Sequence, residues 1–300
     1  MNFAQSIELN WFEDTRARFE VVLAEKLKQL KGPSSELNAA MEYALLDGGK
    51  RLRAMLVFSA GHAVGTAAAE LGDAACAIEA MHAYSLVHDD LPSMDNDVLR
   101  RGKPTCHVKF GEAFALLAGD ALQTAAFQWL AESNQGSVEI RMLQIATLAS
   151  AAGLQGMAGG QAIDLAHVGK PMDLQSLANM HARKTGDLIK ASVRMGYVSN
   201  PDITAVEKNG LEAYAHCLGL AYQVIDDILD VESTSEILGK TSGKDALNNK
   251  PTMVSLMGLG EAKALLAKLR DQAFTACGVI AKPRRVPLET LVELITNRKS

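Results

Sequence analysis

Apolar residues recur along most of the chain with the spacing of an α-helix. No stretch of strand length alternates apolar with polar residues, and only eight prolines interrupt the pattern. From Leu211 onward, Tyr214, Leu218 and Ile225 follow the three-and-four spacing that places side chains on one buried face of a helix. Alanine and leucine, both strong helix formers, dominate these stretches. The pattern therefore predicts an all-α protein.

The domain organisation follows from what the pattern lacks. No stretch rich in Pro, Gly and Ser or in one charge sign divides the 300 residues, so we expect a single domain over residues 1–300. The uncharged segment from Met142 to Ile163 is long enough to span a bilayer. Its three glutamines and four glycines lower its hydropathy, which favours core helices over a membrane span.

The distribution of charged residues and cysteines indicates which partners and which cellular compartment the protein has. The formal net charge of −5 argues against nucleic acid as the main partner. Glu8, Glu13 and Asp14 stand where an export signal needs an apolar core, so we expect a cytoplasmic protein. The four cysteines are scattered without metal-ligand spacing, which fits a reduced chain without disulfides.

Two aspartate clusters carry the candidate chemistry. DDLPSMD runs from Asp89 to Asp95 and DDILD from Asp226 to Asp230, and each cluster directly follows an apolar helical run. Carboxylates are seldom buried without partners, so we expect each cluster to share a cation. Oxygen ligands favour Mg²⁺, which one or two protein carboxylates commonly hold together with a substrate's phosphates. The clusters therefore predict a phosphorylated substrate.

The second cluster lies within a predicted helix. Asp226 and Asp230 are one turn apart, and Gln223 lies one turn before them. The polar face of this helix also includes Asp227. We expect the amide and the three carboxylates to face a common space.

The first cluster spans the end of a predicted helix. Leu91-Pro92 is expected to end the helix that carries Asp89 and Asp90, because a residue before proline leaves the helical region. Asp95 then approaches the site from a loop.

Basic residues recur beside the acidic motifs. Each one alone is more often a solvated surface residue, since Lys and Arg are mostly exposed. Together they fit the neutralisation of a diphosphate. These residues are Lys50, Arg51, Arg53, Arg100, Arg101, Lys103, Lys184, Lys240, Lys244 and Lys250.

Three further features have two interpretations each. His82 lies about 10 Å along the helix from Asp89, so it is either a core histidine or a phosphate contact. Thr185-Gly186 is either a weak point in a helix or a kink that turns Lys184 and Thr185 inward. Gln161 and Asp164 are either packed polar residues or part of the site.

With these residues in place, the chain resembles the trans-isoprenyl diphosphate synthases, and among them the bacterial short-chain farnesyl diphosphate synthase group. The resemblance begins near Leu46 and extends to the C-terminus. The double aspartate pattern with flanking arginines makes it specific. It rests on GGKRLR, HDDLPSMDNDVLRRGKPTCHVKFGEAFALLAGDAL, GMAGGQAIDL, KTGDLI and YQVIDDILD followed by GK.

The resemblance implies a helical bundle around a central active-site cavity, the isoprenoid synthase fold, usually as a homodimer. It implies a head-to-tail (1'-4) prenyltransferase that uses about three Mg²⁺ ions per active site. Isopentenyl diphosphate would condense with dimethylallyl diphosphate and geranyl diphosphate to give farnesyl diphosphate. No protein nucleophile is needed, because the allylic diphosphate ionises and the double bond of isopentenyl diphosphate attacks the cation.

The resemblance also assigns roles to individual residues. Metal would be held by Asp89, Asp95 and Asp226, supported by Asp90, Asp227 and Asp230. The allylic diphosphate would contact Arg100, Lys184 and Lys240. Isopentenyl diphosphate would be held by Lys50, Arg53, His82 and Arg101. Lys250 is a further candidate for substrate binding, and Thr185 and Gln223, with Lys184, form the expected catalytic group.

The resemblance also bears on product length, and the chain differs from similar enzymes at two positions. In the resembling farnesyl synthases, an aromatic residue at the position of Tyr84 and a two-residue insertion in the first motif stop growth at fifteen carbons. Helix geometry places Ser85 on the face of Asp89 and rotates Tyr84 about 140° away, so Tyr84 as core filler stays open. Asp187 and Met253 replace the alanine and the aromatic usual in similar enzymes.

Other activities remain compatible with the motifs. The nearest is a synthase that stops at geranyl or geranylgeranyl diphosphate. A non-catalytic family subunit typically lacks aspartates that this chain retains. A two-metal phosphohydrolase would use the same carboxylates without depending on isopentenyl diphosphate.

Overall fold

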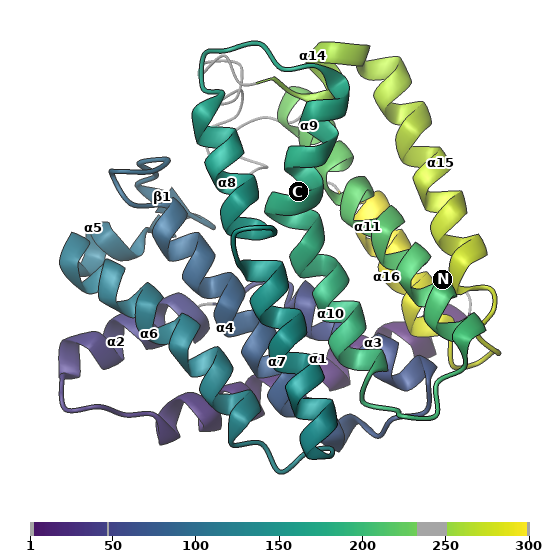
Figure 1. The fold of residues 1–300 in the computed structure, drawn as a ribbon, viewed down its shortest axis with the longest axis horizontal. Helices are drawn as coiled ribbons and strands as arrows, with labels where there is room; N and C mark the ends of the chain where they lie inside the picture. The colour runs from purple at the N-terminus through teal and green to yellow at the C-terminus, as the bar shows by residue number, and fades with distance from the viewer. Residues whose placement is uncertain (1–2, 47, 233–250, 299–300) are drawn as a thin grey trace.

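The computed structural model describes residues 3–46, 48–232 and 251–298, and the regular secondary structure within them is helical apart from one short hairpin (Figure 1). The all-α prediction is confirmed. The first half contains α1 (Phe3–Gln29), α2 (Ser35–Leu46), α3 (Leu52–Ala63), a 3₁₀ turn (Ala68–Glu70), α4 (Gly72–Asp89), β1 (Leu99–Arg100), β2 (Lys103–Pro104), α5 (Cys106–Phe110), α6 (Glu112–Ala131) and α7 (Val138–Ala152). The second half contains α8 (Met157–Ala166), α9 (Leu174–His181), a π-helical turn (Ala182–Gly186), α10 (Asp187–Tyr197), α11 (Ala205–Glu232), α14 (Met253–Met257), α15 (Leu259–Cys277) and α16 (Val286–Thr296).

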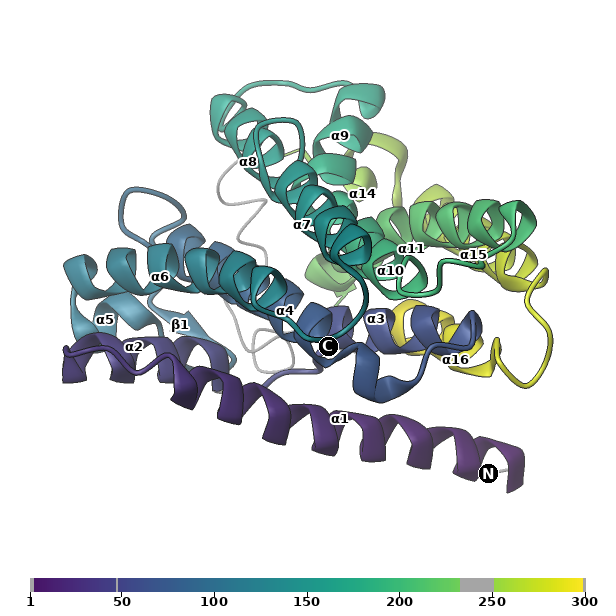
Figure 2. The ribbon, with the colours of Figure 1, turned by 60° about the horizontal axis from the view of Figure 1, so that its bottom comes forward.

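Helices α4 and α10 form the interior of the bundle. α4 packs against α6 and α3, while α10 packs against α3, α7 and α11. Every residue of α4 from Gly72 to Met81 is buried, and the small alanine side chains in this stretch allow neighbouring helices to approach closely. In Figure 2, α1 runs as a long rod beneath the other helices. The buried apolar residues form one continuous cluster.

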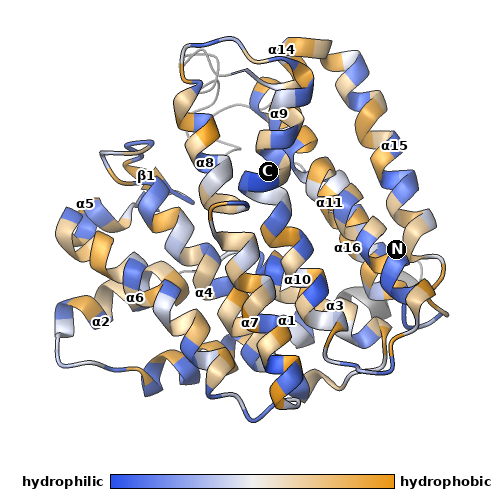
Figure 3. Ribbon diagram, viewed as in Figure 1, coloured by the Kyte–Doolittle hydropathy of each residue, from blue (hydrophilic) through white to orange (hydrophobic). Residues whose placement is uncertain are grey.

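Helix α11 has the amphipathic character that the sequence predicts. Tyr214, Leu218 and Ile225 are buried, and the helix packs against α15 and α10. Figure 3 shows hydrophobic and hydrophilic residues interleaved along α11 and its neighbours, so a buried face coexists with a polar one. The polar face of α11 is therefore free to line a site.

The helix end predicted at Leu91-Pro92 is confirmed, because α4 ends at Asp89 with Asp90 as its C-cap. The hairpin β1–β2 follows, with Leu99 opposite Pro104. Its turn residues Arg101 and Gly102 both have positive φ, the conformation that two-residue hairpin turns require.

The uncharged segment from Met142 to Ile163 does not form one long helix. It is divided between α7, which ends at Ala152, and α8, which begins at Met157. Among the described residues, no helix combines the length and the apolar character needed to cross a bilayer.

Candidate active site

A cavity of about 720 Å³ lies at the C-terminal end of α4, between that helix, α8, the π-helical turn and α11. It brings together residues that lie far apart in the sequence. The predicted site residues that line it are Arg53, His82, Tyr84, Ser85, Asp89, Arg100, Arg101, Lys184, Thr185, Gln223 and Asp226. The predicted residues that do not line it are Lys50, Asp90, Asp95, Asp227 and Asp230, whereas Lys240 and Lys250 lie outside the described residues.

Asp89 enters this cavity from the last turn of α4. The loop after the helix folds back, so that the backbone N–H of Asp95 donates to the carbonyl oxygen of Asp89 at 2.9 Å. Burial raises the pKa of Asp89 to about 6, Lys184 lowers it, and the negative charge of Asp95 raises it further. The charge of the Asp89 carboxylate is thus incompletely balanced, which is the electrostatic condition for attracting a cation.

Asp90 has a different neighbour. Asp90 is 3 % exposed, and its carboxylate accepts charge-assisted hydrogen bonds from both Nη2 and Nε of Arg100, the shortest of each at 2.6 and 2.8 Å. Burial alone would lower the pKa of Arg100, but the hydrogen bond and charge of Asp90 raise it. Asp90 therefore fixes the direction of the Arg100 guanidinium at the cavity wall.

The second cluster divides into two environments. Asp226 lines the cavity, where its carboxylate accepts hydrogen bonds from Gln223 Nε2 at 3.3 Å and from Arg298. Asp227 is buried, and its Oδ2 accepts the backbone N–H of Met253 at 2.6 Å. The expectation that all three carboxylates face a common space is therefore wrong for Asp227, because successive side chains diverge by about 100° around a helix. Met253 is the N-terminal residue of α14, so Asp227 ties α14 to α11.

Lys184 and Thr185 lie in the π-helical turn, at the position of the expected kink, and both line the cavity. The Nζ of Lys184 donates to Asp164 Oδ2 on α8 at 2.6 Å. Gly160 makes this approach possible, since a Cβ at that position would collide with the backbone of Lys184. Of the two interpretations of Asp164, the structure favours the one that includes it in the site.

Gln161 lies one turn before Asp164 on α8 and also lines the cavity. Both polar atoms of its amide are buried without a hydrogen-bond partner among the described residues. Buried amides are nearly always satisfied, so these atoms indicate a site for a polar ligand or water.

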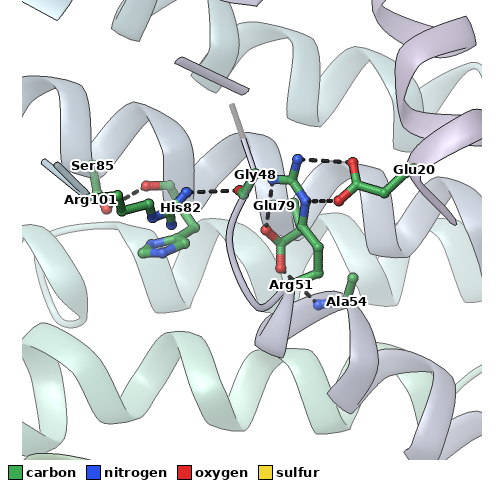
Figure 4. Close-up of polar contacts among 8 residues, drawn as sticks. All are labelled: Glu20, Gly48, Arg51, Ala54, Glu79, His82, Ser85 and Arg101. Atoms are coloured by element: carbon green, nitrogen blue, oxygen red, sulfur yellow. Dashed lines mark hydrogen bonds and ion pairs between the residues drawn. The ribbon is translucent and has the colours of Figure 1, made fainter. Parts of the chain in front are cut away.

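A cluster of basic groups occupies another part of the cavity wall. Arg53 Nε and His82 Nδ1 are buried and have no hydrogen-bond partner in the described part of the chain. Arg101 lies beside His82 and donates from Nη1 to Gly48 O at 2.8 Å (Figure 4). Burial, followed by the charges of Arg53 and Arg101, lowers the pKa of His82 well below its usual range. A neutral histidine among arginines supplies hydrogen bonds to an anion without adding charge.

Lys50 is placed differently from the expectation. It lines a second cavity, also about 720 Å³, between α1, α3 and α16. Burial and the charge of Arg298 lower the pKa of Lys50. Tyr222 lines both cavities, and the charge of Asp226 on the wall of the first cavity acts in the opposite direction on the pKa of Lys50, so Lys50 lies beside the first cavity without lining it.

Tyr84 and Ser85 both line the first cavity. The cavity wall follows α4 around its axis, so it includes Tyr84 although helix geometry rotates that residue away from Asp89. The Tyr84 ring lies edge-on to His88, with centroids 4.9 Å apart. Core filler alone therefore does not describe Tyr84.

The carboxylates that line the cavity fit a magnesium ion that is shared with a substrate. In the described residues, no group of three or more His, Cys, Asp or Glu side chains is close enough to hold a metal ion by itself. Asp89 and Asp226 nevertheless line the same cavity from α4 and α11. Mg²⁺ usually binds through one or two carboxylates plus water and phosphate oxygens, so these carboxylates fit an ion that is shared with a substrate.

Comparisons with known proteins agree on one family. Residues 34–282 match the family model described as polyprenyl synthetase. The chain is 48 % identical over 287 residues to a probable farnesyl diphosphate synthase of Bradyrhizobium diazoefficiens, covering 94 % of this chain and 86 % of that protein. It is 47 % identical over 262 residues to farnesyl diphosphate synthase of Escherichia coli, covering 86 % and 88 % of the two chains.

A solved structure extends the similarity to the fold. It is a geranyltransferase from Helicobacter pylori, complexed with magnesium and isoprenyl diphosphate. The similarity covers 97 % of this chain and 96 % of that chain, with a TM-score of 0.83 and 34 % sequence identity.

Proposed function

Because this chain belongs to the polyprenyl synthetase family, we propose that it is a farnesyl diphosphate synthase. In this proposal, isopentenyl diphosphate condenses head to tail (1'-4) with dimethylallyl diphosphate and then with geranyl diphosphate. One observation carries the proposal. A single cavity combines a carboxylate-lined region, with Asp89 and Asp226, and a separate group of buried cationic and polar donors around Arg53. A reaction between two diphosphates, of which one is bound through metal, needs both regions.

The carboxylate-lined region would bind the allylic diphosphate. Asp89, Asp95 and Asp226 would hold Mg²⁺, of which we propose about three per active site. When bound, Mg²⁺ offsets the negative charge that develops on the departing diphosphate. Asp90 and Asp230 would support this region, and Asp227 would do so indirectly by holding α14 against α11.

Lys184 and Arg100 would bind the oxygens of the allylic diphosphate. Each is already oriented by a carboxylate, Lys184 by Asp164 and Arg100 by Asp90. Cations that are held in place before the reaction stabilise the leaving group without a reorganisation cost. Thr185 and Gln223 would face the allylic carbon with their polar atoms.

The basic cluster would bind isopentenyl diphosphate. Arg53 and Arg101 would supply charge, and neutral His82 would donate or accept one hydrogen bond. The double bond of isopentenyl diphosphate then attacks the allylic carbon, and the released diphosphate is the proposed acceptor of the proton. Apolar wall residues such as Leu86 and Met157 keep water from trapping the cation.

Product length and assembly are parts of the same proposal. Tyr84 and His88 would close the part of the cavity that holds the hydrocarbon chain, so that growth stops at fifteen carbons. A geranylgeranyl diphosphate synthase would need room for twenty. We propose a cytoplasmic protein that forms a homodimer, and Leu117 on α6, which is 49 % exposed and does not line the cavity, offers an apolar contact for the second copy.

The test is a product assay on purified protein. With Mg²⁺, isopentenyl diphosphate and either starter, farnesyl diphosphate is the expected product. Asp89→Ala and Asp226→Ala should abolish condensation while circular dichroism stays unchanged. Phosphate release from an allylic diphosphate alone would indicate a phosphohydrolase, and an inactive but folded wild type would indicate a non-catalytic subunit. A ten- or twenty-carbon product would favour the geranyl or geranylgeranyl alternative.

A further inference from the structure

We propose that Glu79 is a positioning residue for the pocket that binds isopentenyl diphosphate, although it does not line the cavity itself. This inference rests on the proposed function of that pocket. Glu79 acts on two neighbours, Arg51 and the first turn of α3 (Figure 4). Through them it fixes the segment from which Arg53 enters the pocket.

Glu79 supplies the N-terminal cap of a helix to which it does not belong. It lies on α4, is 4 % exposed, and its Oε1 accepts the backbone N–H of Ala54 at 3.0 Å. Helix α3 begins directly after Arg51, and Arg51 gives it no side-chain cap. The first N–H groups of a helix have no partner within the helix. The Glu79 carboxylate satisfies one of them from the neighbouring helix.

Glu79 also holds Arg51 in an uncommon conformation. The backbone of Arg51 is left-handed, with φ of 49°, and the residue is 5 % exposed. Its Nη1 lies 3.7 Å from Glu79 Oε2, while Nε and Nη2 donate to Glu20 on α1 at 2.7 and 3.0 Å. A non-glycine residue keeps such a backbone only where its surroundings determine it. Two carboxylates from α4 and α1 provide these surroundings.

Through these contacts Glu79 affects both Arg53 and His82, which line the pocket from α3 and α4. Arg53 immediately precedes the capped residue Ala54, so the cap fixes the turn that directs Arg53 toward the cavity. His82 lies three residues after Glu79 on α4, about one turn along the same helix. Burial lowers the pKa of Arg53 and of Arg101, and the charge of Glu79 acts against both shifts. One buried carboxylate thus joins the elements that carry Arg53 and His82.

The two oxygens of Glu79 have separate tasks, which makes Glu79→Gln informative. Both oxygens of the carboxylate face donors, Ala54 N–H on one side and the Arg51 guanidinium on the other. A glutamine amide of the same size has one acceptor and one donor group, so one of these contacts becomes donor against donor. Either the α3 cap or Arg51 is then released.

A matched control is present on the same two helices. Asp73 on α4 is buried and pairs with Lys26 of α1 at 2.6 Å, as Glu79 shares Arg51 with Glu20 of α1. Asp73 does not line the cavity. Asp73→Asn therefore also removes a buried charge from α4, at a position nearly two turns before Glu79.

The experiment measures binding of isopentenyl diphosphate to the full-length protein without metal, by titration calorimetry. Glu79→Gln should weaken this binding about tenfold, which corresponds to about 1.4 kcal/mol. Asp73→Asn should change it by less than about twofold, although both variants are expected to melt earlier than wild type. In turnover assays, Glu79→Gln should raise KM for isopentenyl diphosphate and leave KM for geranyl diphosphate near the wild-type value.

Equal binding by Glu79→Gln and Asp73→Asn, with wild-type binding intact, would overturn the role of Glu79 alone. A wild type that binds no isopentenyl diphosphate would instead overturn the proposed function, and this inference with it. Should Glu79→Gln fail to fold, Arg51→Lys tests the same link, because lysine retains the charge but loses the guanidinium that spans Glu79 and Glu20. Arg51→Lys with unchanged affinity for isopentenyl diphosphate would equally refute the proposal.

Discussion

Arg298, just beyond the end of α16, donates a hydrogen bond to the carboxylate of Asp226 on the cavity wall. The same guanidinium donates to Tyr222 O at 2.9 Å and lies over the Tyr222 ring, 4.1 Å from its centroid. A protein cation therefore occupies one of the carboxylates that we propose for Mg²⁺. We therefore expect a bound Mg²⁺ ion and Arg298 to compete for the carboxylate of Asp226.

The first prediction concerns this competition. Arg298→Ala should tighten Mg²⁺ binding about fivefold, because the ion no longer displaces a charge-assisted hydrogen bond. The measurement is a calorimetric Mg²⁺ titration in the presence of inorganic diphosphate. Arg270→Ala is the control, since Arg270 pairs with Glu293 at 2.6 Å on partly exposed side chains outside the cavity. Unchanged or weaker Mg²⁺ binding by Arg298→Ala would show that the contact does not compete with the ion.

The second prediction concerns the stability of the metal-free protein. The pKa of Asp89 is about 6 in the folded state, against an ordinary value of 3.8. At pH values between these two, the folded state therefore binds a proton that the unfolded state has released. The stability of wild type relative to Asp89→Asn is therefore highest near pH 4 and falls as pH rises to about 6. A shift of about two units corresponds to about 3 kcal/mol, and solvent access reduces the expected effect to about 1 to 2 kcal/mol.

Urea unfolding in a chelator at pH 4.5 and pH 7.5 measures this effect. Asp89→Asn should be the more stable protein at pH 7.5, and the difference should shrink at pH 4.5. Mg²⁺ with inorganic diphosphate should stabilise wild type much more than Asp89→Asn, because a bound ion stabilises only the state that holds it. A variant that is less stable than wild type at pH 7.5 without metal would contradict the raised pKa.

The third prediction concerns Asp164. Asp164→Asn removes the charge that orients Lys184, so kcat should fall about tenfold through loss of one charge-assisted contact in the transition state. KM for isopentenyl diphosphate should stay near its wild-type value, because Arg53 and His82 are untouched. Asp187→Asn is the matched control, as Asp187 pairs with Lys190 at 3.0 Å on the following helix. Equal effects of the two substitutions on kcat would remove the special role of Asp164.

The fourth prediction concerns product length. Tyr84→Ala removes the ring that lies against His88, which leaves room in the cavity for another five-carbon unit. The variant should form products of twenty carbons or more, identified by chromatography and mass spectrometry. Truncation of a fully buried aromatic costs about 3 to 5 kcal/mol, so a half-buried Tyr84 should cost less, and a thermal melt checks this. If a folded, active variant still stops at fifteen carbons, Ser85 becomes the next candidate.

Features that depend on nearby residues could be predicted from the sequence. Helix periodicity identified the fold class, since a 3.6-residue repeat is a property of each segment alone. Leu91-Pro92 marked the end of α4 because the proline effect is steric and acts on adjacent residues. Asp89 and Asp226 were recognisable because carboxylates at the end of apolar helical runs are unusual wherever they occur.

The tertiary structure decided which residues meet. Helix geometry turns Asp227 away from Asp226, and the fold provides its partner there, the backbone N–H of Met253 twenty-six residues later. No pattern of apolar residues predicts the hairpin turn at Arg101 and Gly102, yet this turn places Arg101 beside His82.

Glu79 gave no signal in the sequence at all, since a glutamate in an alanine-rich helix is ordinary. Its importance depends on Ala54 and Arg51, which reach it only when α3 packs against α4. Partners of this kind are set by the packing of distant segments, and burial then makes each unpaired polar group costly. The sequence therefore determined the helices and the two acidic motifs, whereas packing determined which charges hold the site in place.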